Sequence, residues 1–148
     1  MTVTPPRLAL LGLAAAAPLL LGACGAPHLK TVRAAQEALV GQDVALLARC
    51  IGEPLAVQQS ADGTPTAYVY SSAQPRGPDG RLRADPAPDL NADPDRHARA
   101  CVFDVAVQDG RILAVRSDNR AGWGFGSITK CSAVVKRCTT AQALRPGE

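Results

Sequence analysis

Aromatic residues are scarce in this sequence, which has one tryptophan, two tyrosines and two phenylalanines in 148 residues. Aromatic side chains bury the largest areas in protein cores, so the core here must rest on Leu, Val, Ile and Ala. Such a core is modest, and small exported domains often add disulfides to compensate. The composition therefore makes the five cysteines the first residues to explain.

Histidine is also rare. The two histidines, His28 and His97, have no carboxylate or nucleophile at a spacing that suggests catalysis. Zinc sites usually contain paired short spacings such as C-x2-C, and the sequence has none. We therefore expect no catalytic residue, no metal, no cofactor and no enzyme activity, with both histidines at the surface.

No segment has the apolar length of a typical membrane-spanning helix, which needs roughly 20 residues. Residues 8–21 form an apolar run of 14 residues that is broken only by glycines and Pro18. Arg7 and the amino terminus give it a positive start. This plan is typical of a secretory signal peptide, to which we assign residues 1–23. The alternatives to a lipoprotein signal are an uncleaved anchor and an ordinary signal peptide.

The run ends in Leu21, Gly22, Ala23 and Cys24. A leucine three residues before a cysteine, with small residues between, resembles the lipobox of bacterial lipoproteins. The resemblance implies cleavage before Cys24 and attachment of a diacylglycerol and a fatty acyl chain such as palmitate. Several acyl chains give lasting attachment, since each buried CH₂ contributes ~0.8 kcal/mol. Gly25 is not the Asp that the resemblance associates with inner-membrane retention, so we expect the outer membrane, facing the periplasm.

Removal of residues 1–23 leaves 125 residues, which suits one domain. The charge count becomes 15 basic against 13 acidic residues, a net charge of +2, which is too weak a balance to indicate nucleic acid. We expect a lipidated tether at 24–28, a domain at 29–138 and a frayed tail at 139–148. A solvated surface explains the late basic residues more simply than contact with headgroups or cell-wall polymer: Lys130, Lys136, Arg137 and Arg145.

Four cysteines follow the lipobox: Cys50, Cys101, Cys131 and Cys138. An even number in an exported chain predicts two disulfides, with three possible pairings. If residues 131–138 form one helix, seven residues separate the two late cysteines by ~10 Å, beyond the ~7 Å reach of a disulfide. At least one bridge should therefore join the C-terminal segment to Cys50 or Cys101.

Helical spacing marks three segments. Apolar residues at helical intervals begin near His28: Leu29, Val32, Ala35 and Leu39. A second helix can be capped by Gln42 or Asp43, ends at Gly52 and Pro54, and has one apolar face: Val44, Leu47, Ala48 and Ile51. Residues 128–138 predict a short C-terminal helix.

Strands are expected at residues 55–59, 66–70, 101–107 and 111–117. Asp109 and Gly110 are typical of a two-residue type I′ hairpin turn. That turn places Val107 opposite Ile112 and Val105 opposite Ala114. Residues 71–100 hold five prolines and few large apolar side chains, so we expect a long mobile loop within the sheet, with partner binding as the alternative.

Glycines alternate with aromatic residues at 122–126, between the last strand and the last helix. No parallel βαβ unit surrounds them, and Trp123 and Phe125 would crowd a phosphate, so a phosphate-binding loop is not expected. The aromatic side chains either cover the end of the sheet or contact a partner protein.

The order of elements resembles the SmpA/OmlA family, which includes the small lipoprotein of the outer-membrane β-barrel assembly machine. The resemblance covers residues 39–70 and 101–115, and it is carried by the helix ending in Gly52-Glu53-Pro54 and by the Asp109-Gly110 turn. The cysteines, the Pro-rich insertion and the C-terminal helix depart from that family's pattern. A sheet with helices on one face also occurs in secreted inhibitors of β-lactamase type, so fold alone does not name the function.

The sequence thus predicts an α+β domain with two N-terminal helices on one face of a three- or four-stranded antiparallel sheet. A short helix follows at the C-terminus. The expected function is that of a lipid-anchored, periplasm-facing envelope lipoprotein that binds another protein, in outer-membrane assembly or envelope integrity. The alternative is a module that inhibits a periplasmic enzyme or binds a ligand.

Overall fold

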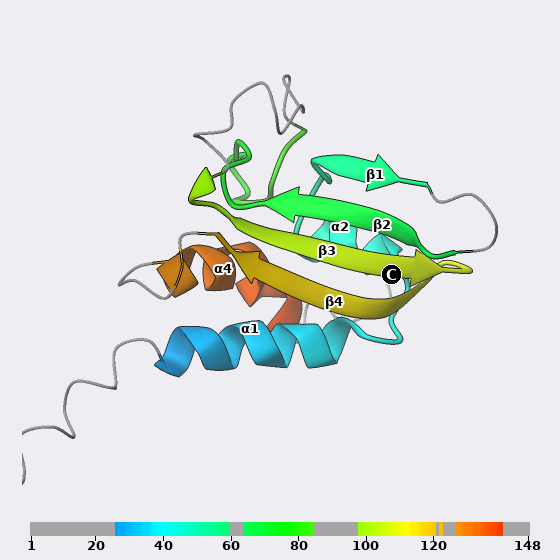
Figure 1. The fold of residues 1–148 in the computed structure, drawn as a ribbon, viewed down its shortest axis with the longest axis horizontal. Coiled ribbons are helices and arrows are strands. Elements are labelled where there is room, and N and C mark those ends of the chain that lie inside the picture. The colour runs from blue at the N-terminus through cyan, green and yellow to red at the C-terminus, as the bar shows by residue number, and fades with distance from the viewer. Residues whose placement is uncertain (1–25, 60–63, 85–97, 121, 123–126, 141–148) are drawn as a thin grey trace, which may run out of the picture.

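The computed structural model describes residues 26–59, 64–84, 98–120, 122 and 127–140 (Figure 1). The signal segment and lipobox, His97 and Arg145 lie outside the described residues. The helices and strands follow this order: α1 (Ala26–Leu39), α2 (Ala45–Cys50), β1 (Ala56–Gln58), β2 (Thr66–Ser71), β3 (Cys101–Gln108), β4 (Arg111–Asn119), α4 (Ser127–Val135) and the 3₁₀ helix η2 (Lys136–Thr139).

In the described part of the chain, the strands form one four-stranded sheet in the order β1-β2-β3-β4, with every neighbouring pair antiparallel. Each strand thus pairs with the next strand along the chain. The α+β class, the antiparallel sheet and the short C-terminal helix were all predicted, and the structure confirms them. Neither Gln42 nor Asp43 is the N-cap of α2, because Val44 holds that position and makes no side-chain cap hydrogen bond. Asp43, one residue earlier, accepts a hydrogen bond of 2.8 Å from the Ala45 amide through its Oδ1.

The β3–β4 hairpin closes on the predicted two-residue turn. Asp109 and Gly110 both have positive φ, of 52° and 73°. Val107 pairs with Ile112 as expected, but Val105 pairs with Val115 and not with Ala114. A β-bulge causes the difference, because one extra residue of β4 lies between the partners of Ala106 and Val107.

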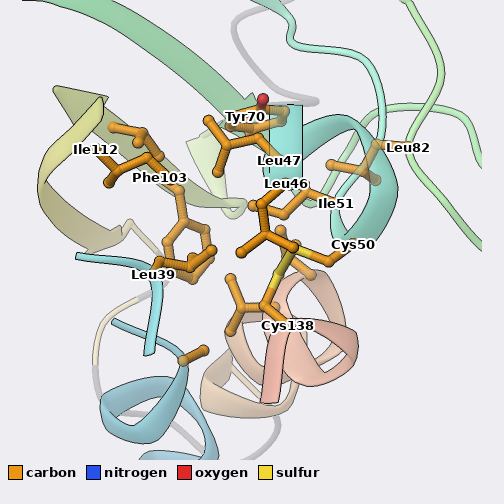
Figure 2. Packing of buried hydrophobic residues seen from close by; sticks show 14 of the residues in the cluster. Leu39, Leu46, Leu47, Cys50, Ile51, Tyr70, Leu82, Phe103, Ile112 and Cys138 are labelled. Atoms are coloured by element: carbon orange, nitrogen blue, oxygen red, sulfur yellow. A yellow bond between two sulfur atoms is a disulfide. The ribbon is translucent and has the colours of Figure 1, made fainter. Parts of the chain in front are cut away.

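The core lies between the sheet and the helices, and aliphatic side chains dominate it, as the composition predicted. Figure 2 shows Leu39, Leu46, Leu47 and Ile51 converging on Phe103. These residues are at most 2% exposed, and they belong to one hydrophobic cluster that also holds all four described cysteines. Helix α1 contributes to this cluster through its predicted apolar stripe, of which three residues are buried: Val32, Ala35 and Leu39.

The packing of the two N-terminal helices as a pair on the sheet is not confirmed. Helix α1 contacts α4 and η2 more extensively than it contacts β4. Figure 1 shows α1 beside α4, with α2 behind the strands. The C-terminal helix is therefore a central part of the helical layer, where the sequence suggested only a closing element. No helix of the described residues combines the length and apolarity needed to cross a membrane.

The first half of the Pro-rich stretch is packed against the domain, contrary to the mobile loop expected for residues 71–100. Leu82 is 1% exposed, its amide donates to the Ile51 carbonyl at 2.8 Å, and its carbonyl accepts from the Glu53 amide at 3.0 Å. Gln74 is 4% exposed. The prediction from composition was wrong for residues 72–84, because one buried leucine and a few hydrogen bonds hold this segment against the domain. Residues 85–97 lie outside the described part.

Candidate functional site

Two disulfides join the described cysteines, as the even count predicted. Cys50 is bonded to Cys138 and Cys101 to Cys131, with Cα–Cα distances of 5.0 and 5.1 Å. Both bridges join the C-terminal helical segment to an earlier element, whereas Cys131 and Cys138 are not bonded to each other. All four side chains are buried. None of the described cysteines therefore offers a free thiol for nucleophilic or metal chemistry.

The remaining predicted site residues lie outside the described residues. These are the lipobox residues and the two aromatic residues proposed for partner contact: Leu21, Gly22, Ala23, Cys24, Trp123 and Phe125. The described neighbours of the aromatic pair nevertheless locate the points where its loop leaves and rejoins the domain. The loop follows β4 and ends at the start of α4.

A groove of about 320 Å³ lies between α1, the end of β4 and the start of α4. We call it the α1–β4–α4 groove. Its lining combines apolar and polar side chains: Leu29, Val32, Arg33, Gln36, Ser117, Asp118, Asn119, Ile128 and Cys131. Gln36 Nε2 donates to Ser117 Oγ at 3.3 Å across one wall. Asn119 and Ile128, which lie on either side of the aromatic segment in the sequence, both line this groove.

His28 of α1 contacts Ser132 of α4 in the helical layer. The sequence could not predict this contact, because the two residues are far apart along the chain. His28 Nδ1 lies 2.8 Å from Ser132 Oγ, although 104 residues separate them. Ser132 Oγ also lies 3.1 Å from the Thr129 carbonyl, which accepts hydrogen bonds only, so the hydroxyl has a partner within α4 as well as in α1. Ser132 is also 5% exposed. The pair therefore fastens α1 to α4.

A second groove, of about 490 Å³, separates the folded insertion from η2. We call it the Arg76–Arg137 groove, and its lining residues include Pro78, Asp79 and Lys136. Its guanidinium groups already bind backbone oxygens. Arg76 Nη1 donates to the Gly80 carbonyl at 3.0 Å, and Arg137 Nη1 donates to the Asp79 carbonyl. These hydrogen bonds hold the folded insertion in its own turn and against η2, so the groove has a structural role.

Asp79 organises the turn beside this groove. Its Oδ1 accepts from the Arg81 amide at 3.1 Å, and its Oδ2 accepts from Arg81 Nε at 2.7 Å and from Arg83 Nη2 at 3.3 Å. The hydrogen bonds from the Arg81 amide and side chain, with the charges of both arginines, lower the pKa of the Asp79 carboxyl below its usual value. Both carboxylate oxygens accept from donors of the turn itself, so the lowered pKa has a structural cause.

Metal-binding chemistry finds no support in the described residues, where no three His, Cys, Asp or Glu side chains lie close enough to hold an ion. Of the two grooves described above, the α1–β4–α4 groove is the one whose lining residues lie next to the aromatic segment in the sequence. Comparison with protein-family models, with curated proteins and with solved structures finds no match for this chain.

Proposed function

We propose that this protein is a bacterial envelope lipoprotein, anchored by acyl chains on Cys24 and facing the periplasm, with a non-enzymatic, protein-binding function. The observation that carries the proposal is the use of the five cysteines. Four of them pair with one another in disulfides. Cys24 is thus left without an intrachain partner, and it is the cysteine at the end of the lipobox. Lipidation explains this odd cysteine.

The disulfides also support export. Such bonds form and persist in oxidising compartments and are rare in reducing ones. Both join the C-terminal helical segment to distant parts of the chain, at sequence separations of 88 and 30 residues. The chain has only five aromatic residues, so its hydrophobic core contributes modest stability. Disulfides add to that stability. The two disulfides are therefore consistent with export of the chain to an oxidising compartment.

The resemblance to lipoproteins and Gly25 after the lipobox cysteine support a location in the outer membrane. The helix ending in Gly52-Glu53-Pro54, the antiparallel strands and the Asp109-Gly110 turn resemble the SmpA/OmlA pattern. This resemblance supports a role in outer-membrane assembly or envelope integrity. The binding surface we propose is the loop with Trp123 and Phe125 together with the adjoining α1–β4–α4 groove.

The anchor is tested by substitution of Cys24→Ala in the full chain, followed by cell fractionation. We expect an unprocessed or soluble form, because the acceptor sulfur of the lipid is gone. Cys24→Ala protein that remains in the outer-membrane fraction as wild type does would contradict the anchor.

Partner binding is tested with a photo-crosslinking amino acid at position 123 or 125 in the native, anchored protein. Leu113, the exposed extra residue of β4 at the hairpin bulge, provides the control position. We expect crosslinks to one outer-membrane protein from 123 and 125, fewer from 113, and loss of that complex when both aromatic residues are changed to Ala. Capture of a soluble periplasmic enzyme would favour the inhibitor alternative, and equal crosslinking from all three positions would contradict the proposed surface.

A further inference from the structure

We propose that one end of the domain lies directly against the bilayer and binds anionic phospholipid headgroups through five basic side chains. These residues form what we call the anchor-proximal face: Lys30, Arg33, Arg99, Arg120 and Lys130. The inference rests on the proposed lipidation of Cys24 and extends it, since it assigns the orientation of the domain and a second contact with the membrane. Arg33 also lines the α1–β4–α4 groove, so the proposed protein partner would meet the domain at the membrane surface.

The short tether makes this contact unavoidable. Helix α1 begins at Ala26, two residues after Cys24. An extended chain spans at most about 3.3–3.6 Å per residue, so the start of α1 lies within about 7 Å of the acylated residue. A lipoprotein with a long tether can keep its domain away from the surface. Here the first turns of α1 must lie at headgroup level.

Helix geometry directs two basic side chains toward that surface. Lys30 and Arg33 are both exposed and lie about 6 and 10 Å along the axis from the start of α1, at a rise of 1.5 Å per residue. The Cα–Cβ bonds of a helix tilt toward its N-terminus, so both side chains lean toward the anchor. Glu37, the only acidic residue of α1, lies a further turn away from the anchor.

The fold brings three more cations to the same end from other parts of the chain. Lys130 Nζ donates to the Arg99 carbonyl at 3.3 Å, which places α4 beside the segment that enters β3. The Arg120 amide donates to the Ala100 carbonyl at 3.1 Å. In Figure 1 the starts of α1, α4 and β3 and the end of β4 all lie at the left end of the domain.

The charge of this face is largely uncompensated among the described residues. Arg120 pairs with Asp118, at 3.4 Å between Nε and Oδ2. The other four basic side chains form no ion pair with a described residue. Because the whole chain after the lipobox is nearly balanced in charge, cations on this face are a local concentration. Basic groups next to a bilayer attract anionic lipids over roughly a Debye length, which is about 10 Å at moderate salt.

Lys130 is close in the sequence to Lys136 and Arg137, but the structure places it at a different end of the domain. Lys136 and Arg137 line the Arg76–Arg137 groove beside the insertion, and Lys130 lies at the opposite end of the same helical segment. Lys30, Lys130 and Lys136 are the three lysines of the chain. Two of them belong to the anchor-proximal face and the third is an internal control.

The test measures the acylation rate of each lysine by an amine-reactive reagent, with mass spectrometry of the digested protein. Full-length lipidated protein is compared in detergent, in phosphatidylcholine vesicles and in phosphatidylcholine vesicles that contain phosphatidylglycerol. We expect Lys30 and Lys130 to react several-fold more slowly in the anionic vesicles, with Lys136 unchanged. High salt should restore much of the rate, because the contact is electrostatic.

Variants of the same full chain test the charge directly. Arg33→Gln combined with Arg99→Gln should reduce the protection of Lys30 and Lys130, whereas Arg76→Gln, in the other groove, should leave it unchanged. Equal rates for Lys30 and Lys130 in all three environments, or equal protection of Lys136, would overturn the inference when Cys24 is acylated. The same digest contains the Cys24 peptide, and an unacylated peptide would instead refute the anchor on which the inference rests.

Discussion

Gly52 lies where α2 ends and where the folded insertion returns to the domain. Its φ is +119°, a conformation that L side chains rarely adopt. A Cβ at this position would also clash with the backbone of Leu82. The hydrogen bonds between Leu82 and the chain around Gly52 require this approach. Gly52 is therefore needed for contact between the insertion and the core, in addition to ending a helix.

Gly52→Ala should lower the free energy of unfolding by about 3 kcal/mol or more, because the backbone strain adds to a clash that only main-chain movement can relieve. Gly41→Ala is the matched control, since Gly41 has φ +81° but nothing within 4 Å of an added Cβ. We expect the control to lose only ~1–2 kcal/mol. Urea unfolding of both variants measures the difference, and equal losses would contradict a role for the Leu82 contact.

Tyr70 is a buried phenol in the hydrophobic core, 1% exposed. Burial, with a smaller contribution from the charge of Tyr68, raises the pKa of Tyr70 far above its usual value of 10.0. The folded protein therefore keeps the Tyr70 proton at a pH where the unfolded chain releases it. Stability from this difference is present below pH 10 and is lost as the pH rises above it.

Tyr70→Phe should accordingly flatten the fall of stability in alkaline solution. The slope of the unfolding free energy above about pH 10 should become less steep by up to ~1.4 kcal/mol per pH unit, the value for one proton. Urea unfolding at a series of pH values measures the slope. Parallel curves for wild type and variant above pH 10 would show that Tyr70 ionises normally in the folded protein.

At the scale of elements, the folded insertion depends on a buried side-chain amide. Gln74 Oε1 accepts from the Ser71 amide at 2.8 Å. Its Nε2 donates to the carbonyls of Glu53 and Arg83 at 3.1 and 3.0 Å. One side chain thus links the end of β2, the chain after α2 and the end of the folded insertion. Hydrogen bonds of this kind substitute for the apolar area that residues 72–84 lack.

Gln74→Ala should cost about 2–3 kcal/mol of stability, because it leaves buried backbone groups without partners. Gln42→Ala, at an exposed position, should change it by less than about 0.5 kcal/mol. Hydrogen exchange gives a local readout: the Leu82 amide should be protected in wild type and exchange faster in the Gln74 variant. Rapid exchange of that amide in wild type would restore the mobile loop expected from composition.

The elements show where sequence reasoning succeeded and where it lacked information. Helical and alternating periodicities gave the helices and strands within a few residues, because local patterns determine which face is buried. The position of α4 beside α1 depends on packing between distant segments, and the His28–Ser132 contact depends on it in turn. The β-bulge after Ile112 changed the hairpin register, although the turn itself was predicted. The disulfide pairing also required the fold, since the sequence disfavoured only a Cys131–Cys138 bond and did not decide between the other two pairings.

Across the whole molecule, the two disulfides fasten the helical layer to different parts of the domain. Cys50–Cys138 joins α2 to η2, and Figure 2 shows this bond beside Leu46 and Ile51. Cys101–Cys131 joins the start of β3 to α4. The second bridge lies within the loop closed by the first. Together they hold the C-terminal segment, which covers α1 and much of the core.

Removal of each bridge should destabilise the protein to a different extent. Loop-closure entropy predicts about 4–5 kcal/mol for the loop of 88 residues and about 3–4 kcal/mol for the loop of 30 residues. Paired Cys→Ala variants with urea unfolding measure both values. A larger loss for Cys101 and Cys131 than for Cys50 and Cys138 would mean that local packing at α4, and not loop length, decides the effect.

The disulfides, the odd cysteine and the short tether all concern one claim, that the chain is exported and acylated on Cys24. The direct measurement is the mass of the N-terminal peptide from protein isolated from its native membrane. The account predicts a peptide that begins at Cys24 and carries a diacylglycerol and a fatty acyl chain. A peptide that retains residues 1–23, with no acyl group on that sulfur, would contradict it.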